Sequence, residues 1–272
     1  MTRPLWVPPE ISVDQPSVAR IYDYNLGGAH NFAVDRAVAE QMNRALPDLP
    51  LIQRANRAFL RRVVTMLVSA GVRQFLDLGS GIPTVGNVHE IAQGIAAESR
   101  VMYVDVDNVA IAHSQAILAD NPLADAVRCD MREADEVLAH PRIVELIDFT
   151  RPVAVLMVAV LHFVSDDDNP AGIMARYRDA CVPGSYLVIS HASREGADPV
   201  EADAATEVGA RNTINLTLRG RTEVLEMFDG FDLVEPGIVF TPEWRPDSDT
   251  ETFATEPSRA STLAGVGRRV QP

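Results

Sequence analysis

Acidic and glycine residues stand close together at the end of an apolar stretch, in the segment RQFLDLGSGIP of residues 73–83. The stretch has the composition of a short buried strand, and Asp77 lies near its end. Gly79 and Gly81 follow, and glycines let a backbone approach a bound ligand because they carry no Cβ. Apolar residues at 88, 91, 92 and 95 then recur with helical spacing. A strand, a glycine turn and a helix form the first unit of a nucleotide-binding α/β sheet.

The details of the glycine turn favour S-adenosylmethionine (SAM) over a dinucleotide. A dinucleotide fingerprint has a third glycine three residues after the second, where the start of the helix packs under a pyrophosphate. This chain has Thr84 at that position, preceded by Pro83. SAM carries no phosphate and does not require the third glycine. A NAD-dependent oxidoreductase is the alternative that this difference disfavours.

A second carboxylate lies where a ribose-binding acid is expected. The segment RVMYVDVD of residues 100–107 reads as an apolar strand that ends in Asp105 and Asp107. Asp105 follows Gly81 by about 24 residues, near the roughly 20 typical of the acid that binds ribose hydroxyls at the tip of the second strand. An ordinary solvated loop acid is the alternative for Asp105. Asp107 is the weaker candidate, and its position suits the cap of a helix that starts near Asn108.

The remaining pattern predicts how these residues are positioned. From residue 73 onward strands alternate with helices, which is typical of a mostly parallel sheet covered on both faces. Residues 17–70 read as helices, and 51–70 form the clearest amphipathic one. Residues 241–257, with three prolines, predict a lid, a binding loop or a disordered segment. Strands are expected at 74–78, 101–105, 126–129, 153–160 and 185–190, a closing pair at 231–240 and 261–270, and helices near 85–97, 109–119, 131–147 and 170–181.

Composition limits the partners of this chain. Its net charge is −14, which opposes non-specific binding to nucleic acid. No apolar run approaches the roughly 18 residues of a membrane span, and the N-terminus has no apolar signal core. Cys129 and Cys181 are far apart and belong to no metal-binding or redox pattern. We therefore expect a cytoplasmic protein with a small-molecule substrate and without a metal, a nucleic-acid partner or a membrane; the sequence indicates no oligomeric state.

Several motifs together resemble a known family. The most specific is ARIYDYNLGGAHNFAVDR at residues 19–36; FLDLGSGIPT (75–84), NVH (87–89), AVLHFV (159–164) and GVGR (265–268) accompany it. The chain resembles class I SAM-dependent methyltransferases, and more narrowly an actinobacterial family of S-adenosyl methyltransferases that was formerly a domain of unknown function. This resemblance implies a Rossmann-like α/β fold, with a mostly parallel seven-stranded sheet and an antiparallel last strand. It also implies an N-terminal helical cap at residues 1–70 and a SAM-binding domain at 71–272.

The cofactor residues are expected at the carboxyl ends of the strands, where ligands bind in such sheets. Asp77 is placed to receive the amino group of SAM, directly or through water. Asp130 matches the position where the superfamily contacts the adenine amino group; capping a helix that starts at Met131 is an equal alternative. Met131 is either an apolar contact to adenine or a core residue. The full expected set is Asp77, Gly79, Ser80, Gly81, Asp105, Asp130, Met131 and Ala159.

Methyl transfer from SAM does not require a recognisable catalytic motif. The leaving group is excellent, so the protein must mainly align the nucleophile, the methyl group and the sulfur, and exclude water. A base helps only when the nucleophile arrives protonated. His162 is the candidate base, with packing beside the cofactor as its alternative, and His191 is the weaker candidate. Because no strong base motif is present, a non-catalytic SAM-binding sensor or regulatory module is a second possible function.

The N-terminal motif is too polar and aromatic for an ordinary helical hairpin. Gly27 and Gly28 in its midst predict a tight turn, and we interpret the segment as a cap over the SAM pocket and the substrate mouth. Helix packing with satisfied hydrogen bonds is the alternative for part of it. Trp244 and Arg245 could close the mouth from the other side, with an exposed structural tryptophan as the equal alternative. The expected lid and substrate residues are Tyr22, Tyr24, His30, Asn31, Phe32 and Arg36.

Overall fold

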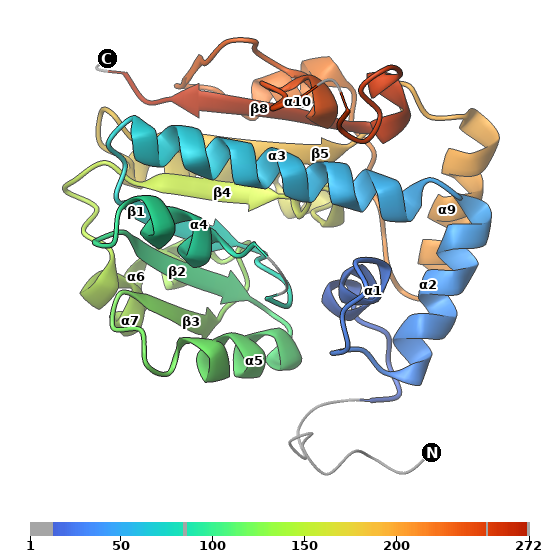
Figure 1. Ribbon diagram of the computed structural model, residues 1–272, viewed down its shortest axis with the longest axis horizontal. Helices are drawn as coiled ribbons and strands as arrows, with labels where there is room; N and C mark the ends of the chain where they lie inside the picture. Colours follow the sequence, from blue (N-terminus) through green and yellow to red (C-terminus); the bar gives the residue numbers. More distant parts are fainter. Residues whose placement is uncertain (1–12, 84–85, 249, 271–272) are drawn as a thin grey trace.

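The strands form a single, mostly parallel sheet. A computed structural model describes residues 13–83, 86–248 and 250–270, and within them the strand order is β3-β2-β1-β4-β5-β8-β6, with β7 also paired to β8 (Figure 1). Strands β1 to β5 are parallel, whereas β8 runs antiparallel to β5. This confirms the predicted Rossmann-like sheet with an antiparallel last strand. The strands are β1 (Gln74–Leu78), β2 (Arg100–Asp105), β3 (Ala124–Arg128), β4 (Ala154–Val158), β5 (Tyr186–Ala192), β6 (Asp232–Leu233), β7 (Val239–Phe240) and β8 (Thr262–Arg268).

The sheet has eight strands in the described part of the chain and not the expected seven, because the single strand expected over residues 231–240 is divided in two. Two short strands, β6 and β7, flank a turn that contains Pro236. Proline has no N–H group to donate, so a strand ladder does not continue through it. β6 pairs with the Arg268 end of β8 and β7 pairs near Leu263, so the two share one edge position.

Helices cover both faces of the sheet, as the alternating pattern predicted. One face carries α3, α4 and α5, and the other carries α6, α7, α8 and α10 (Figure 1). The prediction of a single helix over 131–147 is wrong. One helix ends at Ala139 and the next begins at Pro141, because a proline is tolerated in the first turn of a helix but not in its interior. The bounds are α3 (Leu49–Ser69), α4 (Val88–Ile95), α5 (Asn108–Leu118), α6 (Ala134–Ala139), α7 (Pro141–Leu146), α8 (Pro170–Ala180) and α10 (Arg221–Glu226).

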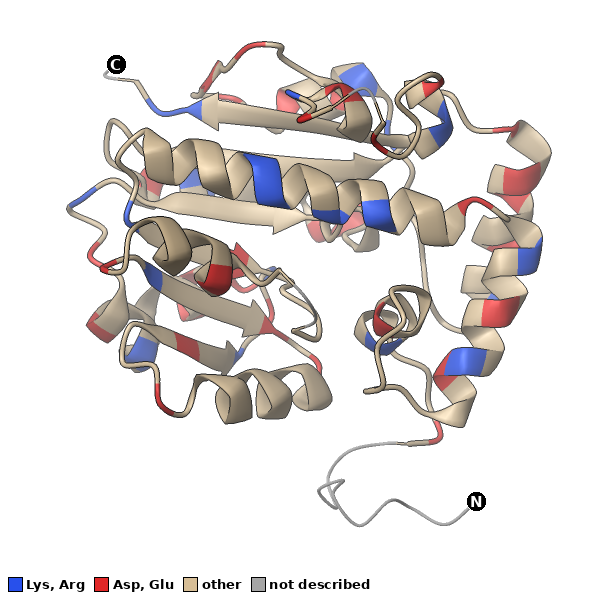
Figure 2. Ribbon diagram, in the orientation of Figure 1, with Lys and Arg blue, Asp and Glu red and all other residues tan. Residues whose placement is uncertain are grey.

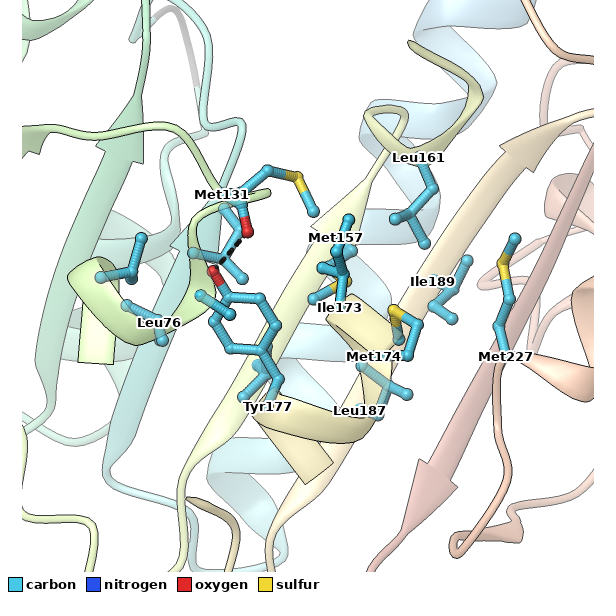
Figure 3. Packing of buried hydrophobic residues seen from close by; sticks show 14 of the residues in the cluster. Leu76, Met131, Met157, Leu161, Ile173, Met174, Tyr177, Leu187, Ile189 and Met227 are labelled. Carbon is cyan, nitrogen blue, oxygen red and sulfur yellow. Dashed lines mark hydrogen bonds between the residues drawn. The ribbon is translucent and has the colours of Figure 1, made fainter. Parts of the chain in front are cut away.

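A hydrophobic core between the sheet and α8 fixes the segment that follows β3. Met157 and Ile189 of the central strands are fully buried and belong to the same cluster as Met174 (Figure 3). Tyr177 of α8 is also buried, and its hydroxyl donates to the carbonyl oxygen of Met131 at 2.8 Å. Burial of each such side chain stabilises the fold by roughly 1.5–3 kcal/mol. The backbone at Met131 is therefore held against the sheet.

The helix α3 packs along the opposite face of the sheet. Phe59, Val63 and Leu67 recur on one side of it, and none of them is exposed to solvent. The ring of Trp244 meets Phe59 edge-on, with 5.5 Å between the ring centroids. The predicted domain boundary at residue 70 separates α3 from the sheet, although the two share one hydrophobic core.

The helices α1 (Val18–Asn25), α2 (Ala33–Ala45) and α9 (Pro199–Arg211) stand beside the carboxyl ends of the parallel strands (Figure 1). Ile21, Val38 and Met42 of α1 and α2 form a small core with Ile214, which follows α9. The sequence did not reveal α9, because small residues such as Ala205 on its buried side give a weak apolar signal. This small core thus joins the N-terminal helices to a segment that follows β5.

Charged side chains of both signs lie on the helices. Figure 2 shows arginines along α3 and residues of both signs on α2 and α9. Within the described ranges no helix is long and apolar enough to cross a membrane. In the same part of the chain, no three His, Cys, Asp or Glu side chains are placed so that they could hold a metal ion together.

Candidate functional site

A cavity of about 690 Å³ lies between the carboxyl ends of the central strands and the helices α1 and α3. Its volume falls within the range of roughly 300–1,000 Å³ that is typical of small-molecule sites. The strand order reverses between β1 and β4, and ligands bind at such switch points. The described lining consists of residues 15–20, Tyr22, Asn56, Arg57, Leu60, Asp77, 79–82, 104–109, 129–132, 158–160, Phe163 and Val164.

The glycine turn after β1 is open toward this cavity. Gly79 and Gly81 have φ angles of +70° and +66°, which favour glycine. A Cβ on Gly79 would lie 2.2 Å from Cγ2 of Val160, so this glycine also allows two strand ends to pack closely. A Cβ on Gly81 would meet no atom within 4 Å. The hydroxyl of Ser80 is buried without a hydrogen-bond partner among the described residues. Open backbone and an unused hydroxyl are what a bound ligand would contact.

Asp105 connects the end of β2 to the glycine turn. Its carboxylate accepts the N–H of Gly81 at 2.7 Å and the N–H of Asp107 at 2.8 Å. The residue is only 8% exposed, so the alternative of a solvated loop acid is wrong. Burial raises its pKa. Asp107 caps α5, as predicted, by accepting the N–H groups of Val109 and Ala110.

Asp77 places a second carboxyl group in the wall of the cavity. The residue is 6% exposed, and burial raises its pKa to about 7; the positive charge of Arg57 opposes this shift and the negative charge of Asp105 adds to it. A buried carboxylate is stabilised by a nearby positive charge. Asp77 is therefore suited to receive a cationic group of a ligand.

Asp130 and Met131 line the cavity beyond the end of β3. The Asp130 carboxylate accepts hydrogen bonds from the backbone N–H and the guanidinium of Arg132. The next helix begins only at Ala134, so the alternative that Asp130 caps a helix starting at Met131 is wrong. Met131 is 6% exposed and belongs to the core cluster of Figure 3, which agrees with its alternative as a core residue. It also lines the cavity, so a contact to adenine stays a prediction.

Ala159 follows β4 in a left-handed conformation that is unusual for alanine, with φ of +57°. Its N–H donates to the carbonyl oxygen and to the hydroxyl of Ser190, at 3.1 and 2.9 Å. The Ser190 hydroxyl donates to Oδ1 of Asn56 at 2.6 Å, and Nδ2 of Asn56 donates to the hydroxyl of Tyr22 at 3.1 Å. The Tyr22 hydroxyl donates in turn to the carbonyl oxygen of Gln53. A continuous series of hydrogen bonds thus links the end of β4 to α3 and the cap.

His162 is not among the described residues that line the cavity. Its imidazole is buried, accepts the N–H of Ala192 at Nδ1, and lies 5.7 Å from the ring of His191. Burial lowers the pKa of His162 well below its ordinary value. His191 has its pKa lowered to about 4 by burial and accepts from Arg219. Both imidazoles are therefore neutral and behind the wall, which argues against the expected role of His162 as a base.

Of the residues expected to form the lid, Tyr22 lines the cavity. Asn31 and Arg36 bond to each other and to the turn, and Asp23 accepts from the backbone of His30 and the amide of Asn31. The remaining expected residues, Tyr24, His30, Asn31, Phe32 and Arg36, are absent from the described lining. Their contacts hold the turn between α1 and α2, which agrees with the alternative of structural packing for this part of the motif.

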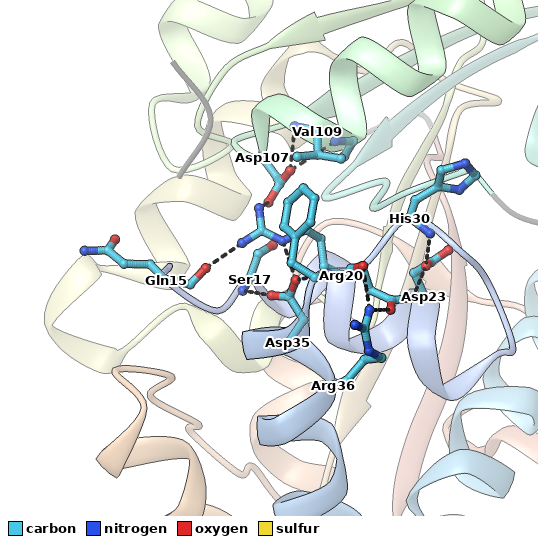
Figure 4. A network of polar contacts seen from close by, with 12 residues as sticks. Gln15, Ser17, Arg20, Asp23, His30, Asp35, Arg36, Asp107 and Val109 are labelled. Atoms are coloured by element: carbon cyan, nitrogen blue, oxygen red, sulfur yellow. Dashed lines mark hydrogen bonds and ion pairs between the residues drawn. The ribbon is translucent and has the colours of Figure 1, made fainter. Parts of the chain in front are cut away.

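Arg20 is a residue of the cap that the sequence did not single out. Its guanidinium donates to Asp35 at 2.9 Å and to the carbonyl oxygen of Gln15 at 2.6 Å, and it lies 3.5 Å from Asp107 (Figure 4). The Arg20 and Asp35 side chains are 5% and 0% exposed. Because Asp107 belongs to the N-terminal end of α5, this buried group connects α1 and α2 to the start of α5.

Trp244 and Arg245 do not close the mouth of the cavity. Trp244 is fully buried against α3, and Arg62 donates to its carbonyl oxygen at 2.9 Å. Arg245 is exposed and donates to the carbonyl oxygen of Glu235. The prediction that this loop closes the cavity is therefore wrong. Asn56, Arg57 and Leu60 of α3 line the cavity instead. One signal in the sequence could have revealed this part of α3. Asn56 is a polar residue within the apolar side of an amphipathic helix.

The fold and the site define a protein of the Rossmann-like class I methyltransferase type. The sequence pattern of the family described as S-adenosyl methyltransferase matches residues 4–270. The chain therefore belongs to this family, and its cofactor is S-adenosylmethionine. The alternative of a NAD-dependent oxidoreductase is thereby excluded.

Solved structures support the same assignment. A crystal structure of a candidate methyltransferase from Thermobifida fusca is 38% identical, with a TM-score of 0.92 over 98% of this chain and 100% of that one. A DUF574 family protein from Streptomyces avermitilis is 39% identical, with a TM-score of 0.90 over 95% of this chain and 100% of that one. An O-methyltransferase family protein from Burkholderia thailandensis, at 12% identity and a TM-score of 0.54 over 82% of this chain and 58% of that one, shares the fold alone. No protein of curated function matches the chain.

Proposed function

We propose that the protein transfers the methyl group of SAM to a small-molecule acceptor that binds between the glycine turn and the cap. The main support for an acceptor site is that the cavity is larger than the part assigned to the cofactor. Beyond the residues expected to hold the cofactor, the cavity continues to Tyr22, Asn56 and Leu60. A module that only senses SAM needs no such space, and the volume suits a metabolite better than a macromolecular acceptor.

In the proposed complex the strand ends hold the cofactor. Asp105 accepts hydrogen bonds from the ribose hydroxyls, in addition to the two backbone N–H groups that it already binds. Asp77 receives the amino group, and Asp130 and Met131 lie beside adenine. Gly81 fits this assignment because its position has space that a side chain would fill. The other residues of the assigned set are Gly79, Ser80 and Ala159, all in the cavity wall.

The residues of the chain act by positioning and by excluding water. When bound, SAM supplies an electrophilic methyl group on a sulfonium. Apolar side chains line the cavity from two sides, Leu60 from α3 and Phe163 and Val164 from the turn after β4, and in the proposed complex they exclude water. Orientation of two reactants in a dry site accounts for much of the rate of such displacements. The proposed reaction therefore proceeds without a base from His162.

A labelling experiment tests this proposal. The protein is incubated with SAM that carries a deuterated methyl group and with a fractionated metabolite extract, and the products are analysed by mass spectrometry. We expect the label in a small molecule, together with S-adenosylhomocysteine. Label found only in protein or nucleic acid would contradict a small-molecule acceptor. Binding of SAM without transfer to any fraction would favour the sensor.

We also propose that residues 1–70 serve as the cap of this site and residues 71–272 as the cofactor-binding domain of a cytoplasmic enzyme. The contribution of Tyr22 to the cavity wall supports the first part. The packing of α9 against α2 indicates that the two parts depend on each other, since the cap core includes Ile214.

A further inference from the structure

Arg57 reaches the cavity from α3, one residue after Asn56 and one turn before Leu60, and all three line it. One N–H of its guanidinium donates to the carbonyl oxygen of Gly86 at 2.9 Å. Gly86 belongs to the segment that follows the glycine turn, just before α4. The guanidinium is therefore anchored at the end of the cavity that the glycine turn forms.

The charge of Arg57 acts on the groups around this end. It opposes the rise in the pKa of Asp77, and it also lowers the pKa values of Tyr22 and Tyr103 against the effect of burial. Asp77 lies at the end of β1 and Arg57 on α3, so the carboxylate and the guanidinium enter the same space from two different elements. A negative and a positive group thus stand on separate walls of one subsite.

The other arginines of the cavity wall serve different carboxylates. Arg20 binds Asp35 and approaches Asp107, and Arg132 binds Asp130. The contacts to Asp107 and Asp130 lie beyond the ends of β2 and β3, on the side assigned to ribose and adenine. Arg57 is the arginine of the described lining whose charge acts on Asp77.

The methionine part of SAM carries an ammonium and a carboxylate on the same carbon atom. We infer that Arg57 binds this carboxylate while Asp77 binds the ammonium, so that α3 and β1 together read the amino-acid end of the cofactor. A guanidinium is planar and matches a carboxylate with two parallel N–H groups, which gives both strength and orientation. This inference rests on the proposed function only in requiring that SAM occupies the cavity.

Decarboxylated SAM separates this role from a structural one, because it lacks only the carboxylate. Calorimetry with SAM and with decarboxylated SAM is carried out on the full chain and on Arg57→Gln. We expect the variant to bind SAM roughly 10- to 100-fold more weakly, as for the loss of a charge-assisted hydrogen bond. Its affinity for decarboxylated SAM should be unchanged or higher. Arg54→Gln, on the exposed side of the same helix, is the matched control and should alter neither affinity.

Two further variants make the outcomes distinct. Arg57→Lys keeps the charge but not the planar fork, and it should recover part of the affinity for SAM. Asp77→Asn should weaken both ligands, because both retain the amino group. Equal losses for SAM and decarboxylated SAM in Arg57→Gln, or no loss for either, would overturn the assignment of Arg57. Failure of the unaltered protein to bind SAM would instead overturn the proposed function.

Discussion

The two halves of the cavity are built in different ways. The strand-end half consists of turns and carboxylates that follow β1, β2, β3 and β4 within a few residues of each strand. The helical half consists of side chains of α1 and α3, joined by hydrogen bonds between distant residues. Tyr22 bonds to Asn56 across 34 positions of the sequence, and Asn56 bonds to Ser190 across 134.

This difference separates the effects of substitutions in the two halves. Backbone hydrogen bonds of the sheet hold the strand-end half, so a changed side chain there should affect ligand binding more than folding. Buried polar contacts hold the helical half, and loss of one partner leaves another buried group unsatisfied. Substitutions of the buried polar residues that join this half, such as Tyr22 and Asn56, should therefore affect folding first.

The largest effect is expected for Arg20→Leu. Asp35 is fully buried, and although backbone N–H groups of Ser17 and Phe32 also donate to it, Arg20 supplies its positive charge. Removing one partner of a buried ion pair typically costs about 3–5 kcal/mol of unfolding free energy. Urea denaturation measures this loss.

The control for Arg20 is an exposed ion pair on α9, the helix that packs against α2. Arg211 and Glu207 on α9 are both well exposed, so Arg211→Ala should cost less than about 1 kcal/mol. An Arg20→Leu protein that is as stable as this control would show that the pair does not hold the cap.

In the strand-end half, Gly81→Val should abolish measurable SAM binding, a loss of at least about 100-fold or 2.7 kcal/mol. The φ angle of +66° disfavours a side chain, and the space at this position belongs to the cavity. Circular dichroism should show helix content close to that of the unaltered protein. Gly71→Val is the matched control, because Gly71 also has a positive φ and open space but does not line the cavity. Normal SAM binding by Gly81→Val would disprove contact between the turn and the cofactor.

The strand-end half was the predictable one. Asp77, Gly79 and Gly81 form one continuous motif, and β1 has the predicted bounds of 74–78. Asp105 follows at a spacing that the sheet dictates, because neighbouring parallel strands end at the same edge. In this half, residues that are close in the sequence are also close in space, so a motif of a few residues is enough to predict where each side chain lies.

The helical half could not be predicted in the same way. The sequence favours a cap for the N-terminal motif, but it does not show which side of each helix faces the cavity. Tyr22 lines it, whereas His30 meets the ring of His113 on α5 at 3.5 Å between centroids. The contacts of Asn56 and Arg57 depend on how α3 crosses the sheet. Long-range packing decides these positions, and single-sequence patterns carry little information about it.

A smaller effect is expected from pH through Asp77. Its pKa of about 7 lies above the ordinary value of 3.8, so the carboxyl group of the folded protein is charged only above about pH 7. If Asp77 binds the amino group of SAM, affinity should be full above this pH and fall as pH decreases. The limit is about tenfold, or 1.4 kcal/mol, per pH unit. Calorimetry between pH 6 and 8 measures this slope, which Asp77→Asn should remove.

The same raised pKa has an opposite consequence for stability. The folded state favours the protonated form of Asp77, so this contribution is present below about pH 4 and is lost as pH rises through about 7. At pH 8 the ligand-free Asp77→Asn protein should therefore melt at a higher temperature than the unaltered protein. A lower melting temperature would contradict the view that Asp77 is kept at a cost in stability for ligand binding.

The smallest effect is expected for His162→Gln, although the sequence made this histidine the candidate base. Its Nδ1 accepts a backbone N–H, and burial keeps the imidazole neutral behind the cavity wall. Glutamine can accept the same hydrogen bond with its side-chain oxygen. SAM affinity, and single-turnover methylation of the acceptor identified by labelling, should both stay within about threefold, or 0.7 kcal/mol. Removal of a true general base typically slows the reaction by about 10²–10⁴. A loss of that size with unchanged SAM affinity would restore His162 as the base, and would require its side chain to reach the cavity in the complex.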